Sequence, residues 1–140
     1  MDAVVIYESL TGNTRKAATL LAGELRAQGV VATACPVTTI DHQALSRADL
    51  VIVGSWTDGA LVVGQRPGRA HRLRSMPALE AKRCVVFCTY ALDPGKTLAK
   101  MTTIMEGRGA TVLGGMAIRR SNIDGGVRDL VGRLLSAVGA

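Results

Sequence analysis

Aromatic side chains are scarce in this chain: one tryptophan, two tyrosines and one phenylalanine occur among 140 residues. Proteins that bind single-stranded nucleic acid stack its bases on exposed aromatic rings, and so few rings provide no such platform interleaved with arginines. No recognition-helix motif is present either. The sequence therefore predicts no specific nucleic-acid partner, because basic charge alone supports only weak, salt-dependent binding.

Long apolar runs are missing and cysteines are few. No stretch of about 18 uninterrupted apolar residues suggests a membrane span, and the N-terminus lacks the basic and apolar regions of a signal peptide. The three cysteines, Cys35, Cys84 and Cys88, mostly lie in apolar segments. This placement favours reduced core cysteines over a disulfide framework or a metal site. We therefore expect a cytoplasmic protein without a membrane span or a metal.

Acidic residues are outnumbered, with 11 Asp and Glu against 17 Lys and Arg, and the sequence pI is near 9.8. Hydrophobic residues make up 48% of the chain and charged residues 20%. At this length, such a composition is typical of one compact domain. We expect residues 1–140 to form that domain.

Short runs rich in β-branched residues alternate with helical patterns along the chain. This alternation predicts an α/β fold with a parallel sheet covered on both faces. The five predicted strands are residues 3–7, 30–35, 50–54, 84–88 and 110–113. The five predicted helices are residues 15–28, residues 41–47, a basic helix that begins near Arg66 or Pro67, residues 94–106 and a last helix through Val127 and Val138.

The most informative stretch lies between the first predicted strand and the first predicted helix. It reads Ser9-Leu10-Thr11-Gly12-Asn13-Thr14. A helix N-terminus offers unpaired N–H groups to an anion, while hydroxyl and carboxamide groups add donors and glycine permits a tight turn. The stretch predicts a phosphate site. An ordinary helix cap at Thr11 or Asn13 is the structural alternative.

Two of the four aromatic residues, Trp56 and Tyr90, are expected in the loops after the third and fourth strands. In an open α/β sheet, ligands bind beyond the carboxyl ends of the strands. Both rings would then lie at the same sheet edge as the phosphate site, where they could stack on a planar ring system attached to the phosphate. The alternative is that they cap the ends of the core.

Two other nucleotide or phosphate folds are disfavoured by single residues. Gly95-Lys96-Thr97 resembles the end of a Walker A loop, but Tyr90 stands where that loop requires glycine. Asp93-Pro94 instead reads as a helix N-cap with proline at the first helical position. A phosphorylatable receiver domain needs an aspartate at the end of the third strand, where this chain has Gly54-Ser55.

With these motifs the chain resembles the flavodoxin family, over essentially its whole length and in the family's short-chain form. The resemblance rests on the phosphate loop after the first strand, the aromatic-containing second loop and the tyrosine-containing third loop. It implies a doubly wound five-stranded parallel sheet of order 2-1-3-4-5 and an FMN cofactor. It further implies an electron carrier that works between a reductase and an acceptor, with no catalytic acid–base residue.

The resemblance also implies which residues bind FMN. Ser9, Thr11, Asn13 and Thr14 would hold the phosphate with Ser55 as a further donor, Trp56 and Tyr90 would flank the flavin ring, and Asp58-Gly59 would supply a flexible peptide. The full set of expected cofactor-binding residues is Ser9, Leu10, Thr11, Gly12, Asn13, Thr14, Ser55, Trp56, Thr57, Asp58, Gly59, Thr89, Tyr90 and Ala91. The second loop departs from the family pattern, because Trp56 directly follows Ser55.

The basic charge is a second departure, since flavodoxins are usually acidic. Arginines crowd the predicted third helix, and their simplest role is a solvated helix face. The sharper hypothesis is a docking patch for an acidic redox partner or an anionic substrate. We also expect nearby arginines to raise the reduction potential of the flavin by Coulomb attraction. Leu61, Val62 and Val63 would form an apolar rim or pack under this helix.

Two further functional classes stay open. The first is an FMN-dependent reductase or oxidase that acts on a quinone-like or porphyrin-like substrate. The second is a flavin-free interaction module that keeps the fold. Sequence alone does not name the electron donor, the acceptor or the oligomeric state.

Overall fold

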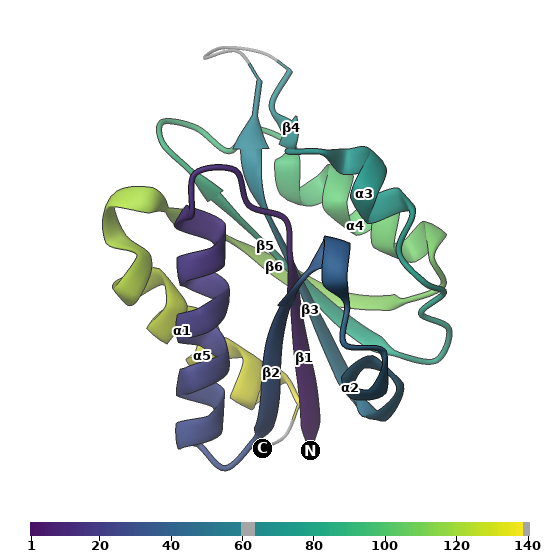
Figure 1. Cartoon of the computed structure of the whole chain (residues 1–140). Coiled ribbons are helices and arrows are strands. Elements are labelled where there is room, and N and C mark those ends of the chain that lie inside the picture. The colour runs from purple at the N-terminus through teal and green to yellow at the C-terminus, as the bar shows by residue number, and fades with distance from the viewer. Residues whose placement is uncertain (60–63, 139–140) are drawn as a thin grey trace.

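The computed structural model describes residues 1–59 and 64–138. A twisted sheet forms its centre, with helices packed on both sides (Figure 1). The strands are β1 (Asp2–Tyr7), β2 (Val31–Pro36), β3 (Leu50–Asp58), β4 (Arg66–Pro67), β5 (Arg83–Tyr90) and β6 (Thr111–Arg119). The helices are α1 (Asn13–Ala27), α2 (His42–Arg47), α3 (Ala70–Arg74), α4 (Thr97–Gly107) and α5 (Ile123–Ala137), with 3-10 turns η1 (Val37–Thr39) and η2 (Arg120–Asn122).

The strand order of the sheet is β2-β1-β3-β5-β6, and neighbours on this path run parallel. The two-residue β4 lies off the path and pairs antiparallel with the end of β3, Thr57 opposite Pro67. With β4 set aside, this is the predicted doubly wound order 2-1-3-4-5, which is confirmed. All five parallel strands end at the same edge of the sheet, the upper edge in Figure 1.

Two hydrophobic layers sandwich the sheet, because successive strand residues point to opposite faces. Val5 and its neighbours pack with α1 and α5, whereas Val4 packs with α2, α3 and α4. The three cysteines are free thiols buried in this core, as the sequence predicted. Among the described residues, no helix is long and apolar enough to cross the hydrocarbon core of a membrane.

Two predicted helices begin later than expected. The basic region does not form a helix from Arg66: this residue lies in β4, Arg69 adopts a left-handed conformation with φ of 47°, and α3 begins only at Ala70. The prediction that Asp93-Pro94 starts a helix is also wrong. The Asp93 carboxylate accepts a hydrogen bond from the Gly95 N–H at 2.9 Å, and Gly95 has a φ of +52°. This turn delays α4 to Thr97.

Three strands extend further than the sequence indicated. The last, predicted to end at residue 113, continues as β6 to Arg119. β3 continues to Asp58 and β5 to Tyr90, so that Trp56 and Tyr90 lie in strand ends rather than in loops. The extension is held by pairing of Trp56 with Thr89 and by the β4 segment. The predicted apolar rim at residues 61–63 lies outside the described residues.

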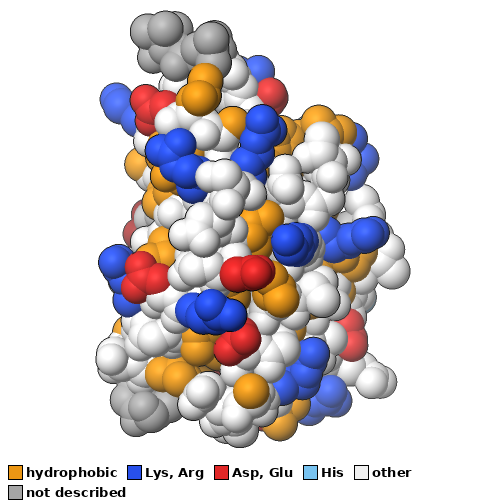
Figure 2. Space-filling view, turned by 90° about the vertical axis from the view of Figure 1, so that its left-hand side faces the viewer, with side chains coloured by type: hydrophobic (Ala, Val, Ile, Leu, Met, Phe, Trp, Pro, Cys, Tyr) orange, Lys and Arg blue, Asp and Glu red, His pale blue; other side chains and the backbone are white. Residues whose placement is uncertain are grey.

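Charged side chains are mixed on the face that α1 and α5 form. Figure 2 shows blue and red side chains interspersed over it rather than one basic patch. Arg133 and Asp129 of α5 form an ion pair of 3.3 Å on the surface. The basic residues that matter for the site are therefore those at the carboxyl edge of the sheet.

Candidate functional site

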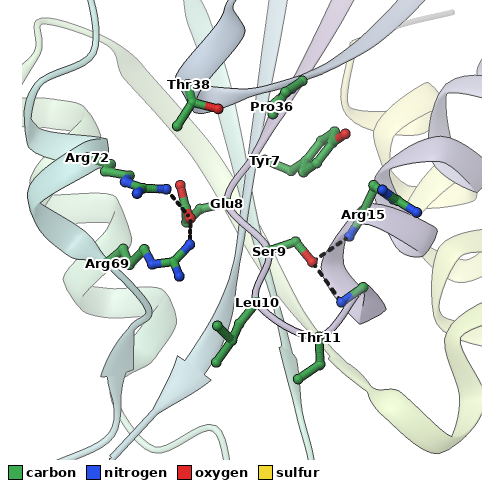
Figure 3. Close-up of a pocket in the computed structure, with 11 residues that line it drawn as sticks. Tyr7, Glu8, Ser9, Leu10, Thr11, Arg15, Pro36, Thr38, Arg69 and Arg72 are labelled. Atoms are coloured by element: carbon green, nitrogen blue, oxygen red, sulfur yellow. Dashed lines mark hydrogen bonds and ion pairs between the residues drawn. The ribbon is translucent and has the colours of Figure 1, made fainter.

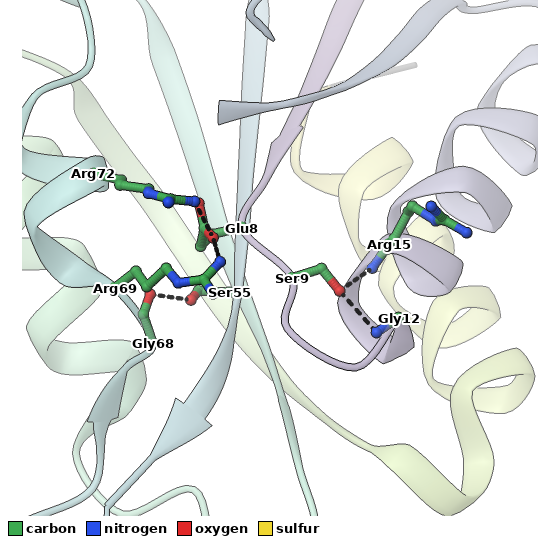
Figure 4. A network of polar contacts seen from close by, with 8 residues as sticks. All are labelled: Glu8, Ser9, Gly12, Arg15, Ser55, Gly68, Arg69 and Arg72. Carbon is green, nitrogen blue, oxygen red and sulfur yellow. Dashed lines mark hydrogen bonds and ion pairs between the residues drawn. The ribbon is translucent and has the colours of Figure 1, made fainter. Parts of the chain in front are cut away.

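The loop from Ser9 to Gly12 joins the end of β1 to the start of α1. Gly12 has a φ of 97°, a left-handed conformation that glycine adopts readily, and it is the N-cap residue without a side-chain cap. The Ser9 hydroxyl oxygen accepts hydrogen bonds from the N–H groups of Gly12 at 3.2 Å and Arg15 at 3.3 Å (Figure 4). Helix α1 thus begins at Asn13, two residues earlier than predicted, and Ser9, which accepts from the N–H groups at its start, lies four residues before it.

The loop retains donors for an anion. Asn13 and Thr14 occupy the first turn of α1, where a helix supplies no internal acceptor for the backbone N–H. The Asn13 carboxamide donates to the Thr11 hydroxyl at 3.3 Å, and both side chains remain accessible. Thr14 is buried, and its hydroxyl lies 2.9 Å from that of Thr89 in β5. This pair links the start of α1 to the end of β5.

The Trp56 ring at the end of β3 is tightly packed. A Cβ added to Gly68 would lie 2.0 Å from the ring, so only glycine lets the backbone approach it. The Gly68 N–H donates to the Trp56 carbonyl at 2.8 Å, and the Ser55 hydroxyl donates to the Gly68 carbonyl at 2.9 Å. The Arg69 guanidinium lies 5.5 Å from the centre of the Trp56 ring. These contacts fix one side of the ring within the protein.

A buried ion-pair network connects this region to β1. Glu8 follows β1 directly and is only 3% exposed. Its Oε1 accepts from Arg69 Nη1 at 2.8 Å and from Arg72 Nη1 at 3.0 Å, as Figures 3 and 4 show. The buried carboxylate is thus paired with positive charge, as a buried charge requires, and two guanidinium groups share it.

Tyr90 at the end of β5 carries a cation on one side as well. The Arg119 guanidinium lies 5.2 Å from the centre of its ring. Arg119 Nη1 also donates a hydrogen bond of 3.3 Å to the Ala91 carbonyl, which fixes this arrangement. Arginines thus accompany both aromatic rings at this edge.

A cavity of about 200 Å³ lies where the loop after β1 meets the ends of β3 and β5. It brings together most of the predicted cofactor-binding residues: Ser9, Leu10, Thr11, Asn13, Thr14, Trp56, Thr57, Thr89, Tyr90 and Ala91. Four predicted residues do not line it. Ser55 is fully buried with its hydroxyl bonded to Gly68, Asp58 forms an exposed ion pair of 3.5 Å with Arg66, Gly12 lines the neighbouring cavity, and Gly59 lies at the end of the described segment.

Thr57 lines this cavity, and its Oγ1 is buried. The Thr57 hydroxyl interacts with the Cys88 thiol, which lowers the pKa of Cys88 against the larger rise from burial. A thiol is only a weak hydrogen-bond partner. A ligand atom that reached Thr57 would offer its hydroxyl a stronger hydrogen bond.

A larger cavity of about 540 Å³ lies on the other side of the phosphate loop (Figure 3). It shares Ser9, Leu10 and Thr11 with the first cavity and extends toward the end of β2. Its remaining lining residues are Tyr7, Glu8, Gly12, Arg15, Pro36, Thr38, Arg69 and Arg72. We call the two cavities the smaller and the larger pocket.

The cysteines do not contribute to the chemistry of this edge. Burial raises the pKa of Cys84 to about 12 and that of Cys88 to about 11, and it raises the pKa of Cys35 as well. These thiols are protonated and unreactive near neutral pH. Among residues 1–59 and 64–138, no group of three or more His, Cys, Asp or Glu is placed to hold a metal ion.

Sequence reasoning missed several residues of this region. Arg120 lines the smaller pocket, and Glu8, Arg69 and Arg72 line the larger one. Glu8 carried a readable signal, since a carboxylate directly after an apolar strand is unusual. Arg120 follows β6 at the same carboxyl edge. Glu8 pairs with Arg69 and Arg72, which lie 61 and 64 positions further along the chain. No signal in a single sequence predicts this pairing.

Comparisons with known proteins agree with the observed fold. A family model described as a flavodoxin domain matches residues 4–128. No curated protein matches the chain.

Several solved structures share the fold. The two-electron reduced flavodoxin of Megasphaera elsdenii has 21% identity, with 99% of each chain covered and a TM-score of 0.77. A cysteine-to-serine mutant of the Pseudomonas aeruginosa flavodoxin has 16% identity, with 100% of each chain covered and a TM-score of 0.74. Oxidised flavodoxin 1 of Bacillus cereus has 21% identity over 99% of this chain and 98% of that one, with a TM-score of 0.72.

Proposed function

The chain belongs to the flavodoxin family, whose cofactor is FMN and whose general activity is electron transfer, and on this premise we propose that it shuttles electrons between a reductase and an acceptor. The smaller pocket supports this proposal most directly, because it joins the phosphate loop to both aromatic side chains. We further propose that residues 1–140 act as one domain in the cytoplasm.

FMN, when bound, supplies one- and two-electron redox chemistry without a protein acid–base pair. Among the side chains of this chain, Thr11 and Asn13 would hold the phosphate, together with the first-turn N–H groups of α1. Trp56 and Tyr90 would flank the flavin ring, and the Thr57 hydroxyl would bond the cofactor in place of the Cys88 thiol. Ser55 is not available to the phosphate, because its hydroxyl is bonded to the Gly68 carbonyl within the core.

The charge around the pocket bears on the redox partner. Arg69, Arg119 and Arg120 lie beside or in the pocket, and the formal net charge of the chain is +6. Opposite charge accelerates the encounter of two proteins and orients them. We propose an acidic redox partner that docks at this edge, against the exposed Leu10 and Leu92.

The cofactor assignment is tested by comparing FMN with riboflavin, which lacks the phosphate. We expect the purified protein to bind FMN with a flavin absorption spectrum and to bind riboflavin far more weakly. Thr11→Ala and Asn13→Ala should each weaken FMN about tenfold or more, because a hydrogen bond to a charged group contributes about 1.5–3 kcal/mol. Riboflavin affinity should change little.

Thr39→Ala is the matched control, since Thr39 is exposed and lines neither pocket. Equal losses for FMN and riboflavin would contradict the phosphate role. A protein that stays colourless with added FMN would favour the flavin-free module instead.

The larger pocket favours a second candidate, an FMN-dependent reductase or oxidase with a small substrate. This pocket adjoins the smaller one through Ser9, Leu10 and Thr11, so a second small molecule could lie beside the flavin. Steady NAD(P)H-driven reduction of a quinone without any added reductase would support this candidate. Its absence would leave the carrier function as the explanation.

A further inference from the structure

We propose that the larger pocket binds a nucleoside diphosphate, separately from the flavin in the smaller pocket. The pocket lies beyond the carboxyl ends of β1 and β2, between α1 and α3 (Figure 3). Its volume of about 540 Å³ falls within the range of small-molecule sites, about 300–1,000 Å³. The inference goes beyond electron transfer and does not depend on it.

The positive charge of this pocket exceeds what its carboxylate requires. Arg69 and Arg72 both donate through Nη1 to the same Glu8 oxygen, although one guanidinium would neutralise the carboxylate. Each side chain is about a third exposed, 36% for Arg69 and 37% for Arg72. A guanidinium carries five N–H donors, and most of these are left to bind an anion. Phosphate oxygens match this fork of donors.

The rest of the lining suits a nucleoside. The two arginines contact only Oε1 of Glu8, so Oε2 can accept from a ribose hydroxyl in the pocket that Glu8 lines. Thr38 is exposed and adds a hydroxyl to the lining of the same pocket. Tyr7 and Pro36 supply apolar surface for a base. Figure 3 shows Tyr7, Pro36 and Thr38 on one side of the cavity and Glu8 with the arginines on another.

Calorimetric titration of the FMN-saturated protein with ADP tests this proposal. Inorganic pyrophosphate and adenosine are the comparison probes, and FMN affinity is measured separately for every variant. We expect one ADP site that leaves FMN bound, with weaker binding of pyrophosphate and little of adenosine. This order follows because the phosphates contact the arginines and the nucleoside contacts Glu8 and Tyr7.

Three arginine variants separate the two pockets. Arg72→Gln should weaken ADP about tenfold or more, because it removes a charged donor, and leave FMN affinity unchanged. Arg74→Gln is the matched control, since Arg74 lies on the same helix and lines neither pocket. Arg120→Gln should weaken FMN and spare ADP, because Arg120 lines only the smaller pocket.

Several outcomes would overturn the proposal. They are no ADP binding at about 1 mM, displacement of FMN by ADP, pyrophosphate binding as tightly as ADP, or equal effects of Arg72→Gln and Arg74→Gln with both variants folded by circular dichroism. If FMN does not bind at all, the same ADP titrations are made on the protein alone. Failure of the flavin function and failure of this site are then seen separately.

Discussion

Two threonine hydroxyls, those of Thr57 and Thr97, are buried, and that of Thr57 interacts with the Cys88 thiol. Thr57 lines the smaller pocket, whereas Thr97 is the first residue of α4 and lines neither pocket. Both residues are threonines with a buried hydroxyl, but only Thr57 lies at the smaller pocket. They therefore form a matched pair for detecting a bound ligand.

Thr57→Val should change the stability of the apoprotein by less than about 1 kcal/mol, because the hydroxyl that it removes interacts only with a weakly bonding thiol and the shape of the side chain is nearly kept. The same change should weaken FMN about tenfold, since the hydroxyl would otherwise bond the cofactor. Thr97→Val should have the first effect without the second. Urea unfolding of the apoproteins and FMN titration make the measurement; equal FMN affinities in both variants would exclude Thr57 from the cofactor site.

Glu8 is the single carboxylate that compensates Arg69 and Arg72. Glu8→Gln should lower the free energy of unfolding by about 1–2 kcal/mol, a value below that for fully buried pairs because both arginines reach solvent. Urea unfolding at low and high salt measures the loss. The deficit should shrink in an Arg72→Gln background, where less positive charge is left uncompensated. A full loss in both backgrounds would mean that Glu8 acts through packing alone.

At the scale of the elements, Trp56 at the end of β3 packs against Gly68, which follows β4. This contact holds the end of β3 and the turn after β4 together. A Cβ at Gly68 would lie 2.0 Å from the Trp56 ring, so Gly68→Ala must displace the ring or the turn. We expect a loss of about 1–3 kcal/mol, typical of overpacking. The emission spectrum of Trp56 should shift at the same time.

Gly132→Ala is the opposite case within the same chain. Gly132 lies in the middle of α5, and a Cβ there would meet nothing within 4 Å. Alanine in a helix interior should raise stability by about 0.5–1 kcal/mol. Thermal unfolding of Gly68→Ala and Gly132→Ala compares their stabilities with that of the wild type. A Gly68→Ala variant as stable as the wild type would disprove the tight packing at Trp56.

The elements were largely predictable because their signals are local. Runs of β-branched residues located all five parallel strands, and the apolar repeat of Leu21 and Leu25 located α1. Two of the errors involved features beyond the local pattern. β3 extends through Trp56 because Thr89 and Pro67 pair with it, and a left-handed Arg69 delays α3; neither is visible in a residue's own neighbourhood.

For the whole molecule, the buried thiols predict how stability depends on pH. Burial raises the pKa of Cys84 to about 12 and of Cys88 to about 11 from 9.0. Above about pH 9 the unfolded chain therefore releases protons that the folded protein keeps, and the free energy of unfolding falls with rising pH. The contribution is fully present below that pH.

Urea unfolding at about pH 8 and about pH 10.5 measures this fall. The double variant Cys84→Ala/Cys88→Ala should lose less stability across that interval than the wild type, whatever its stability at the lower pH. The slope per group is at most about 1.4 kcal/mol per pH unit. Identical falls in both proteins would assign the alkaline loss to other groups.

The arginines at the carboxyl edge make a second prediction for the whole molecule, about the flavin's reduction potential. Arg119→Gln and Arg120→Gln should lower it by a few tens of millivolts each, because a cation about 8 Å away stabilises added negative charge by about 1 kcal/mol at intermediate screening. Arg74→Gln should lower it less. Spectroelectrochemical titration decides, and equal potentials in all three variants would remove electrostatics as the cause.

The candidate site was predictable where it depends on one sheet edge. Strand order places the ends of β1, β3 and β5 together, so Thr11, Trp56 and Tyr90 meet as expected. The larger pocket was not foreseen, because it depends on the side chains of Arg69 and Arg72 reaching Glu8. Ion pairs between residues so far apart in sequence emerge only from the assembled fold.

Trp56 is the sole tryptophan of the chain, and it borders the smaller pocket while its ring stands beside Arg69 of the larger one. Indole fluorescence therefore reports from this one location, with no background from elsewhere and no need for an attached dye. Flavin arriving next to the ring would quench the emission, whereas an anion drawn to Arg69 would alter its wavelength. Occupancy of the two neighbouring cavities could thus be followed in real time by light alone.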